Sequence, residues 1–333
     1  LTSEGARFYQ ASVELFEGLS RELDFNLFYT RRGHFTLAHS PASLRTQRWR
    51  AEVNKTLGID SEVVDPDFIQ KQVPEMDLSC GGHQAPVHGA LYHPPGSIAR
   101  HDAVAWAYAR GADRQGVEIH QQTEVDGIEV RDGEVIGVHT DRGFIQTRKV
   151  LSAVAGWTPS ITSMVGIRTP LVIHPLQAMV TEPLKPWLHP IIVSASMHMY
   201  LSQSTRGELV AGASLDPYEL TSMRSTLGFA ESLAADMMDL FPCLSDIKVL
   251  RQWAGLCDMT PDFSPIMGIT PIKGFYLDAG WGTWGFKATP ISGKTMAYTL
   301  AHDHPHPLIE SFRLDRFRDF QMVGEKGAAS VGH

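Results

Sequence analysis

The most informative segment of the chain reads Asp278-Ala279-Gly280-Trp281-Gly282-Thr283-Trp284-Gly285-Phe286-Lys287-Ala288-Thr289-Pro290. The residues from Phe275 to Ala279 predict a buried strand, which runs through a loop with three glycines into a helix. Thr289 is the expected N-cap of that helix, and Pro290 fits its first turn. Glycines let a flat ligand approach the backbone closely, and a helix N-terminus attracts an anion. The segment therefore fits either a site for a planar anionic ligand or a tight strand-to-helix turn.

Composition and charge exclude several classes of protein. The 333 residues include 29 basic and 37 acidic ones, which gives a net charge of −8. Hydrophobic residues make up 43% and charged residues 20%, as in an ordinary globular protein of about two domains. An acidic chain without a basic run is not expected to bind nucleic acid. No apolar run approaches the roughly 20 residues of a membrane span.

The three cysteines, Cys80, Cys243 and Cys257, are widely spaced. This spacing predicts neither a disulfide framework nor paired zinc ligands, so a reducing cytoplasm is expected. The segment His302-Asp303-His304-Pro305-His306 is rich in histidine but is predicted to be a solvated loop. No metal site is expected.

The first half of the chain alternates helices with short strands. Helices are predicted over residues 4–24, 43–57 and 100–115, and a short one begins at Asp65-Pro66. Strands are predicted on both sides of a turn at Arg31-Arg32-Gly33 and within 84–93 and 116–120. Alternating apolar and polar residues then predict an antiparallel meander over 125–130, 134–140 and 143–146.

A buried strand follows the meander and ends in the small residues Ser152-Ala153-Val154-Ala155-Gly156, which would leave room for a cofactor. The second half is predicted to hold helices over 226–241 and 290–302 and strands over 172–182, 191–195, 199–203, 208–213, 248–260, 266–270 and 275–279. A meander, a small-ended strand, a strand-rich insertion and a strand–glycine loop–helix unit follow one another in this order in FAD-dependent amine oxidases.

Several motifs make the resemblance more specific. The chain resembles the beta subunits of heterotetrameric sarcosine oxidases, which belong to the glycine oxidase and D-amino-acid oxidase superfamily. The matching stretches span nearly the whole chain and are Arg31-Arg32-Gly33, residues 96–107 (GSIARHDAVAWA), His174-Pro175-Leu176-Gln177-Ala178 and residues 280–287 (GWGTWGFK).

The resemblance implies an α/β fold of the FAD-dependent amine oxidase type. A Rossmann-like FAD-binding domain over residues 1–24, 94–170 and 262–333 would interleave with an antiparallel-sheet substrate domain over 25–93 and 171–261. The opening strand–Gly-x-Gly-x-x-Gly–helix unit is absent from the sequence. Because the chain also begins at Leu1 without an initiator Met, we expect an N-terminally truncated copy that binds FAD poorly or not at all, whereas the intact protein should bind FAD.

The resemblance also implies two flavins. FAD would be held noncovalently, and FMN would be attached through the histidine that matches His101. An imidazole nitrogen is a tunable nucleophile that can add to the flavin 8α-methyl group, whereas the alternative for His101 is a helix-capping role. The other implied FMN contacts are Arg100 and, with packing as an alternative, His174. Val125, Gly282 and Gly285 are the implied FAD contacts, and Lys287 is an implied contact of FAD or FMN.

Three residues are candidates for catalysis. Lys287 would place a fixed ammonium near flavin N5 or the substrate carboxylate, although a surface lysine at a helix start is the alternative. His198 and Tyr200 are predicted to share one strand face above the substrate and to orient its amine, with packing as the alternative. Trp284 stands where the family loop has a glycine, a difference that would narrow the cavity or alter the path of the loop.

The implied activity is the oxidative demethylation of sarcosine to glycine. FAD would accept a hydride, and electrons would pass through FMN to O2 and give H2O2. The one-carbon unit would go to tetrahydrofolate or leave as formaldehyde. Alpha, gamma and delta subunits are the implied partners, with NAD on the alpha subunit. Two alternatives stay open: a single-flavin amine or imino-acid dehydrogenase subunit of dimethylglycine or proline type, and a non-catalytic subunit.

Overall fold

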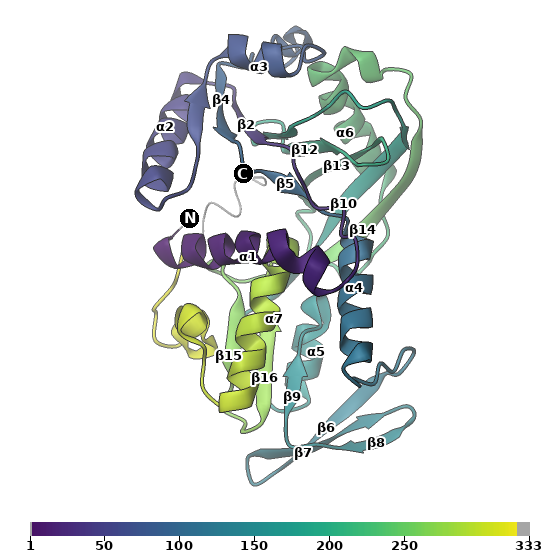
Figure 1. Ribbon diagram of the computed structural model, residues 1–333. Helices are drawn as coiled ribbons and strands as arrows, with labels where there is room; N and C mark the ends of the chain where they lie inside the picture. Colours follow the sequence, from purple (N-terminus) through teal and green to yellow (C-terminus); the bar gives the residue numbers. More distant parts are fainter. Residues whose placement is uncertain (1, 325–333) are drawn as a thin grey trace.

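The computed structural model describes residues 2–324. Its largest element is an eight-stranded sheet, drawn in the upper half of Figure 1. All its neighbouring strands are antiparallel except the pair β11–β2. The strands, in spatial order, are β14 (Val249–Met259), β10 (Val172–Pro183), β13 (Glu208–Leu215), β12 (Met199–Gln203), β11 (Ile191–Ser194), β2 (His34–Ala38), β4 (Gly89–His93) and β3 (Glu62–Val64).

The two faces of this sheet have different surroundings, because successive side chains of a strand point to opposite faces. One face packs in the largest hydrophobic core, where Met179, Leu201 and Leu209 meet Met237 of helix α6 (Leu227–Leu240). Helix α3 (Pro66–Gln72) contributes Ile69 to the same core. The alternate residues of the same strands face away from this core. The sheet thus has one buried apolar face and one face available to build a site.

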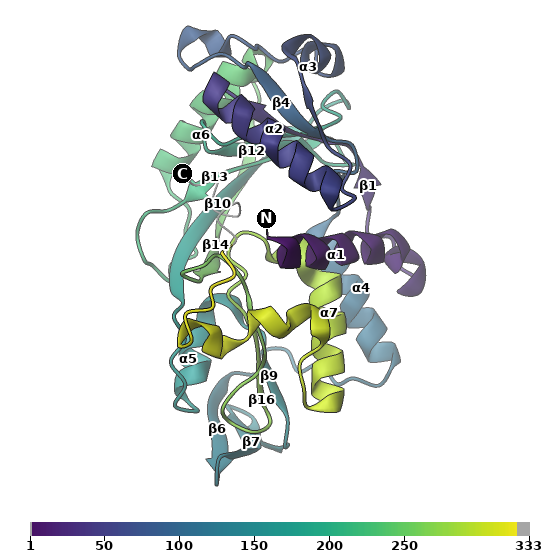
Figure 2. The ribbon, with the colours of Figure 1, turned by 90° about the vertical axis from the view of Figure 1, so that its left-hand side faces the viewer.

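A second, smaller sheet lies in the lower half of Figure 1. Strand β16 (Phe275–Ala279) is its centre and pairs in parallel with β9 (Val150–Ser152) and antiparallel with β15 (Ile266–Ile269). Helix α7 (Gly285–His302) packs on it through Ala288, Ile291 and Met296, together with Phe8 of helix α1 (Ser3–Glu22). Figure 2 shows α1 passing between the two halves of the molecule.

The remaining elements connect or extend these sheets. The predicted meander is confirmed as β6 (Val125–Arg131), β7 (Glu134–Thr140) and β8 (Gly143–Gln146), at the lower end of Figure 1. A two-stranded ribbon of β1 (Thr30–Arg31) and β5 (Ser97–Ile98) leads into helix α4 (His101–Arg114). Helices α2 (Pro41–Thr56) and α5 (Thr158–Ser163) complete the regular structure. In the described part of the chain, no helix could cross a membrane.

One predicted strand is absent. Residues 116–120 are not a strand: Val117 and Ile119 are 52% and 51% exposed, and no described strand pairs with this segment. An extended segment becomes a strand only where a neighbour accepts its backbone hydrogen bonds. The strands predicted on both sides of the Arg31-Arg32-Gly33 turn are present as β1 and β2, although β1 pairs with β5 whereas β2 pairs with β4 and β11.

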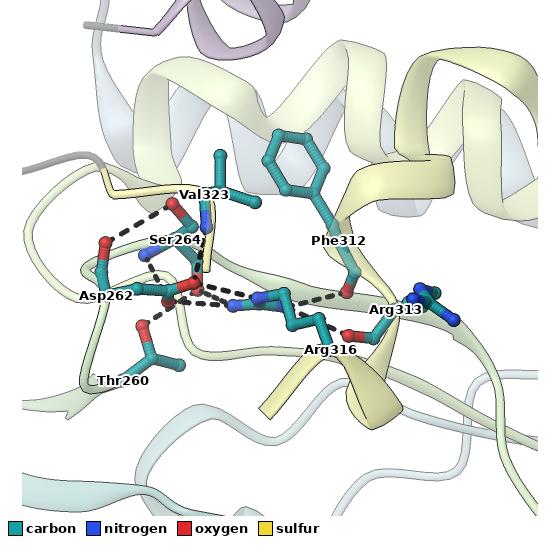
Figure 3. Close-up of polar contacts among 7 residues, drawn as sticks. All are labelled: Thr260, Asp262, Ser264, Phe312, Arg313, Arg316 and Val323. Atoms are coloured by element: carbon teal, nitrogen blue, oxygen red, sulfur yellow. Dashed lines mark hydrogen bonds and ion pairs between the residues drawn. The ribbon is translucent and has the colours of Figure 1, made fainter. Parts of the chain in front are cut away.

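A buried ion pair fastens the C-terminal part of the described chain to the turn after β14 (Figure 3). Arg316 is fully buried, and its guanidinium donates to both carboxylate oxygens of Asp262 at 2.8 and 2.9 Å. The same guanidinium donates to the carbonyls of Phe312, Arg313 and Ser264. Every charge in this network is therefore matched by hydrogen bonds, the condition for a tolerable buried ion pair.

Candidate active site

A cavity of about 770 Å³ opens between the eight-stranded sheet, the start of α4 and the start of α7. The α4 end contributes Arg100, His101 and Asp102, and α7 contributes Phe286. The sheet contributes the residues that point away from its apolar core. These lining residues are Val180 of β10, Tyr200 and Ser202 of β12, Glu208 and Val210 of β13, and Arg251 and Trp253 of β14.

Strand register explains why residues far apart in sequence share this wall. Val180 pairs with Arg251 on one side and with Val210 on the other, and Val210 pairs with Ser202. These four residues therefore form one row across β14, β10, β13 and β12. Such directly paired residues lie on the same face of a sheet and are close neighbours. The sheet presents a continuous patch to the cavity.

The charges in the cavity are only partly matched. Arg100 donates to both oxygens of Asp102 at 2.7 and 2.8 Å, and Arg206 pairs with Glu208 at 2.6 Å. Arg251 forms no ion pair with any residue between 2 and 324. The cavity thus carries one positive charge beyond its internal pairs, which suits an anionic group on a ligand.

His101 is the first residue of α4, as the sequence predicted for the helix start. Its side chain is exposed at the cavity edge. The imidazole forms no hydrogen bond with the described part of the chain, and Arg100 at the N-cap position does not cap the helix through its side chain. His101 therefore borders the cavity, and its side chain does not hold the helix end through a hydrogen bond to any described residue.

The glycine-rich segment differs in detail from the prediction. Helix α7 begins at Gly285, so Thr289 is not its N-cap and Pro290 lies inside the helix. Proline lacks the N–H that would bond the carbonyl of Phe286, four residues earlier. The Thr289 hydroxyl donates to that carbonyl at 2.9 Å and takes over the missing bond. This local substitution lets the helix start before the proline.

The loop before α7 is organised by a buried carboxylate that the sequence reasoning missed. Asp258, at the end of β14, is 2% exposed and accepts backbone N–H bonds from Gly280, Trp281 and Gly282 at 2.6, 3.1 and 3.3 Å. Burial raises its pKa, and the three N–H groups offset this only in part. The available sequence signal was an acidic residue inside the apolar stretch Leu256-Cys257-Asp258-Met259.

Lys287 lies in an aromatic and basic environment. Its Nζ is 3.0 Å from the ring centre of Trp284 and 4.3 Å from that of Tyr9. Burial, followed by the charges of His93 and Lys287, lowers the pKa of His34 to about 3. Both His34 and His93 are therefore neutral near Lys287 at physiological pH. Trp284, which stands where the family loop is expected to have a glycine, contacts Lys287 directly.

The other predicted residues do not all reach the cavity. Tyr200 lines it, but His198 does not share its strand face. His198 lies in the turn between β11 and β12 with a left-handed φ of 51°, and its charge acts on Asp236 of α6, the helix that packs on the apolar face of the sheet. His174 does not line the cavity either; its Nδ1 lies 3.0 Å from the carbonyl oxygen of Asp216.

Val125, Gly282 and Gly285 lie outside the cavity but close to the smaller sheet. Val125 begins β6 and packs in the same core as Phe275 and Leu277 of β16. Gly282 has a φ of 52°, and a Cβ there would lie 2.8 Å from the Met259 sulfur. The loop after β16 therefore requires glycine for both conformation and space.

The fold and this cavity define a class of protein. Aromatic walls from Phe28, Trp253 and Phe286, an arginine without an ion pair among the described residues, and a volume within the range of cofactor sites suit a flavin. A glycine-rich loop after a parallel strand and before a helix is a typical place for a nucleotide cofactor. Together they indicate a flavin-dependent oxidoreductase.

Comparisons with known proteins agree with this class. The family model described as "FAD dependent oxidoreductase" matches residues 2–299, and the chain belongs to this family. It is 41% identical to "Sarcosine oxidase subunit beta" of Arthrobacter sp over 100% of this chain and 82% of that protein. It is also 41% identical to the protein of the same name from Rhizobium meliloti, over 96% and 76% of the two chains.

A solved structure shows the same fold. The L-proline dehydrogenase from P.horikoshii superposes with a TM-score of 0.87 at 27% identity and covers 94% of this chain and 83% of its own. The prediction of an α/β fold of the FAD-dependent oxidoreductase type is thus confirmed.

Proposed function

We propose that the protein is the beta subunit of a sarcosine oxidase and oxidises the N-methyl amine of sarcosine. The similarity over the full chain to proteins named as such subunits supports this assignment. The observation that carries it is the cavity, which brings His101, Arg100, Tyr200 and Phe286 together. When bound, flavin would accept the hydride and the electrons that the substrate gives up. The residues of this chain would bind and orient the reactants.

The cavity is the proposed FMN site. His101 stands at its edge, with an imidazole that forms no hydrogen bond to residues 2–324, and would bond the flavin covalently. Trp253 and Phe286 provide flat apolar walls for the ring system. Arg100 is already bound to Asp102, so Arg251 is the cation best placed to meet an anionic group. His174 lies outside this cavity, and its proposed contact with FMN is the weakest of the set.

FAD is proposed to lie along the smaller sheet. Gly282 and Gly285 would allow its ring system close to the backbone, and Val125 would contact its adenosine part. Lys287 would supply positive charge where the reduced flavin or the substrate carboxylate carries negative charge. Its ring contacts with Trp284 and Tyr9 hold the ammonium at one place. The substrate would bind against the sheet face that carries Tyr200, while His198 stays a catalytic candidate without contact to the cavity.

This arrangement supports the proposed division of labour between domains. Segments 25–93 and 171–261 hold the strands of the eight-stranded sheet and would form the substrate side. Segments 1–24, 94–170 and 262–333 hold the smaller sheet with α1, α4 and α7 and would form the FAD side.

Partners and electron acceptors belong to the same proposal. Alpha, gamma and delta subunits would complete the enzyme, with NAD on the alpha subunit, tetrahydrofolate as carbon acceptor and O2 as electron acceptor. Trp106, 60% exposed on the same helix as His101, and Phe28, 38% exposed beside the cavity, are suited to contact a partner subunit. The cysteines in the described residues are all free, which agrees with a cytoplasmic location.

A single-flavin dehydrogenase is the second candidate. The superposition on an L-proline dehydrogenase at a TM-score of 0.87 favours it. Such an enzyme would pass electrons to an acceptor other than O2 and would not need a flavin on His101.

Substrate and acceptor tests separate the two candidates. The purified native protein is given sarcosine, dimethylglycine or L-proline, and H2O2 formation in air is compared with dye reduction without oxygen. We expect sarcosine-dependent H2O2, lost in His101→Ala and kept in the control His120→Ala, which changes an exposed histidine. Dye reduction with L-proline, no H2O2 and unchanged turnover in His101→Ala would establish the dehydrogenase instead.

A further inference from the structure

The loop that is proposed to hold FAD does not offer its backbone donors to a ligand. The N–H groups of Gly280, Trp281 and Gly282 all point to the carboxylate of Asp258. The carbonyl of Asp258 also accepts from the N–H of Gly282, at 3.2 Å. Successive N–H groups in such a turn form a concave site for an anion. Here a side chain of the protein itself occupies that site.

We propose that Asp258 is the positioning residue for the FAD ring system. It would fix the path of the loop from Gly280 to Gly282, and so place Gly282, Gly285 and Lys287 against the flavin. This inference rests on the proposed function, because it assumes that this loop binds FAD.

The local geometry supports a positioning role. Gly280 and Gly282 have φ values of 72° and 52°, a strained path that any residue with a side chain would resist. A Cβ on Gly280 would lie 2.6 Å from Thr260, and one on Gly282 would lie 2.8 Å from Met259. The loop is therefore pressed against the end of β14 on the side that carries Asp258. Three hydrogen bonds to one carboxylate hold it there.

A second buried carboxylate steadies the other side of the loop. Asp278 accepts a hydrogen bond from the Trp281 indole at 2.7 Å and another from the Ser292 hydroxyl of α7. Burial raises the pKa of Asp278, with a further contribution from Asp258. The backbone of the loop is thus bound to β14, while its Trp281 side chain is bound to Asp278 of β16, which also accepts the hydrogen bond from α7. Of these two contacts, only the hydrogen bonds from the loop backbone to Asp258 order the glycines that would face the cofactor.

Asp258 also has an electrostatic consequence for that cofactor. A negative charge beside an electron acceptor disfavours its reduction, and the Lys287 ammonium opposes this effect. Removal of the Asp258 charge should therefore make the flavin at this loop easier to reduce. A residue that served stability alone would not change the midpoint potential in a defined direction.

The test compares Asp258→Asn with Asp262→Asn in the native protein. Asp262 is a matched control, because it is also a buried carboxylate near the end of β14, at 4% against 2% exposure, but it binds Arg316 instead of the loop. FAD dissociation is followed by absorbance and fluorescence, and the midpoint potential by reductive titration. In Asp258→Asn an amide N–H would face backbone donors, and we expect FAD affinity to fall about tenfold or more.

The expected potential shift for Asp258→Asn is to more positive values, whereas Asp262→Asn should leave the affinity and potential of FAD unchanged. Asp258→Glu keeps the charge and lengthens the side chain, so we expect weaker FAD binding with the wild-type potential. The Asp258→Glu variant also tests the inference if Asp258→Asn does not fold. Wild-type affinity and potential in both Asp258 variants would overturn the inference. A wild-type protein that holds no FAD would instead contradict the proposed function.

Discussion

The ring of Tyr200 lies directly over Gly212 on the neighbouring strand. The two residues are paired between β12 and β13, and a Cβ at Gly212 would lie 2.4 Å from the Tyr200 ring and 2.5 Å from its hydroxyl oxygen. The ring therefore occupies the space that a side chain at Gly212 would fill. Burial raises the pKa of Tyr200, so its hydroxyl stays protonated as a donor toward the cavity.

Gly212→Ala should push the Tyr200 ring out of this place. Overpacking of this kind costs about 1–3 kcal/mol of stability, and the displaced ring should raise the KM for the amine substrate. Gly228→Ala is the control, since a Cβ there meets nothing within 4 Å. Unfolding by urea and steady-state kinetics measure both effects. Equal KM values in the two variants would exclude a role of Tyr200 in substrate binding.

Lys287→Met should remove the positive charge proposed to act on the flavin and substrate. Loss of one such electrostatic contact lowers kcat by about 100- to 1,000-fold. The same change should raise the pKa of His34, because the Lys287 charge contributes to its depression. NMR titration of His34 provides the second measurement. Unchanged kcat together with a raised His34 pKa would leave Lys287 as a structural neighbour only.

The Arg316–Asp262 pair should be a major source of stability. Arg316→Leu leaves a buried carboxylate without its partner, which typically costs about 3–5 kcal/mol. Arg318→Ala, in which the lost side chain is 75% exposed, should cost about 1 kcal/mol or less. Denaturant unfolding at neutral pH compares the two variants. A loss in Arg316→Leu no larger than in Arg318→Ala would contradict the assignment.

The stability contribution of the Arg316–Asp262 pair should decrease at acid pH. Burial raises the pKa of Asp262, but the Arg316 guanidinium and backbone N–H groups outweigh it and hold that pKa below its ordinary value. The pair therefore contributes stability above the ordinary carboxyl pKa, and this is lost as the pH falls through the lowered value. The stability difference between wild type and Arg316→Leu should shrink on acidification below about pH 4. A constant difference down to pH 3 would argue against it.

The stability contribution of His34 has the same sign of pH dependence as that of Asp262, because both folded pKa values are lowered, but it begins to decline at a higher pH. Its folded pKa of about 3 lies below the ordinary histidine value, so the unfolded chain binds the extra proton first. Its contribution to stability is complete above about pH 6.5 and declines as the pH falls toward 3. His34→Gln should flatten the pH dependence of the free energy of unfolding in this range. Identical slopes for wild type and variant would show that His34 does not titrate in this way.

Much of the fold could be predicted from the sequence, where periodicity and turns are local. The meander was predicted because Asp132-Gly133 and Asp141-Arg142-Gly143 interrupt clear alternation. The strand prediction for residues 116–120 was wrong because their composition suits a strand but no described strand pairs with them. Helix α7 was placed too late because Pro290 looked like a first-turn residue, whereas the Thr289 hydroxyl supplies the bond that proline lacks.

The candidate site was predicted only in part, because some of its residues are placed by strand register and not by local sequence. The predicted residues His101 and Tyr200 both line the cavity; one was singled out by a motif and the other by its place in a regular strand. Arg251 and Trp253 were missed because only the register of β14 against β10 brings them to the cavity. His198 was misplaced because a left-handed turn residue cannot be distinguished from a strand residue by alternation alone. Local sequence patterns do not predict long-range strand pairing or backbone strain.

The covalent state of His101 tests the central claim most directly. The native protein is denatured in acid, the chain is weighed, and its peptides are mapped by mass spectrometry. We predict that one flavin mononucleotide stays attached to the peptide that contains His101, and that His101→Ala removes it while FAD is still released on denaturation. A wild-type chain of unmodified mass, with an unmodified His101 peptide, would contradict the account.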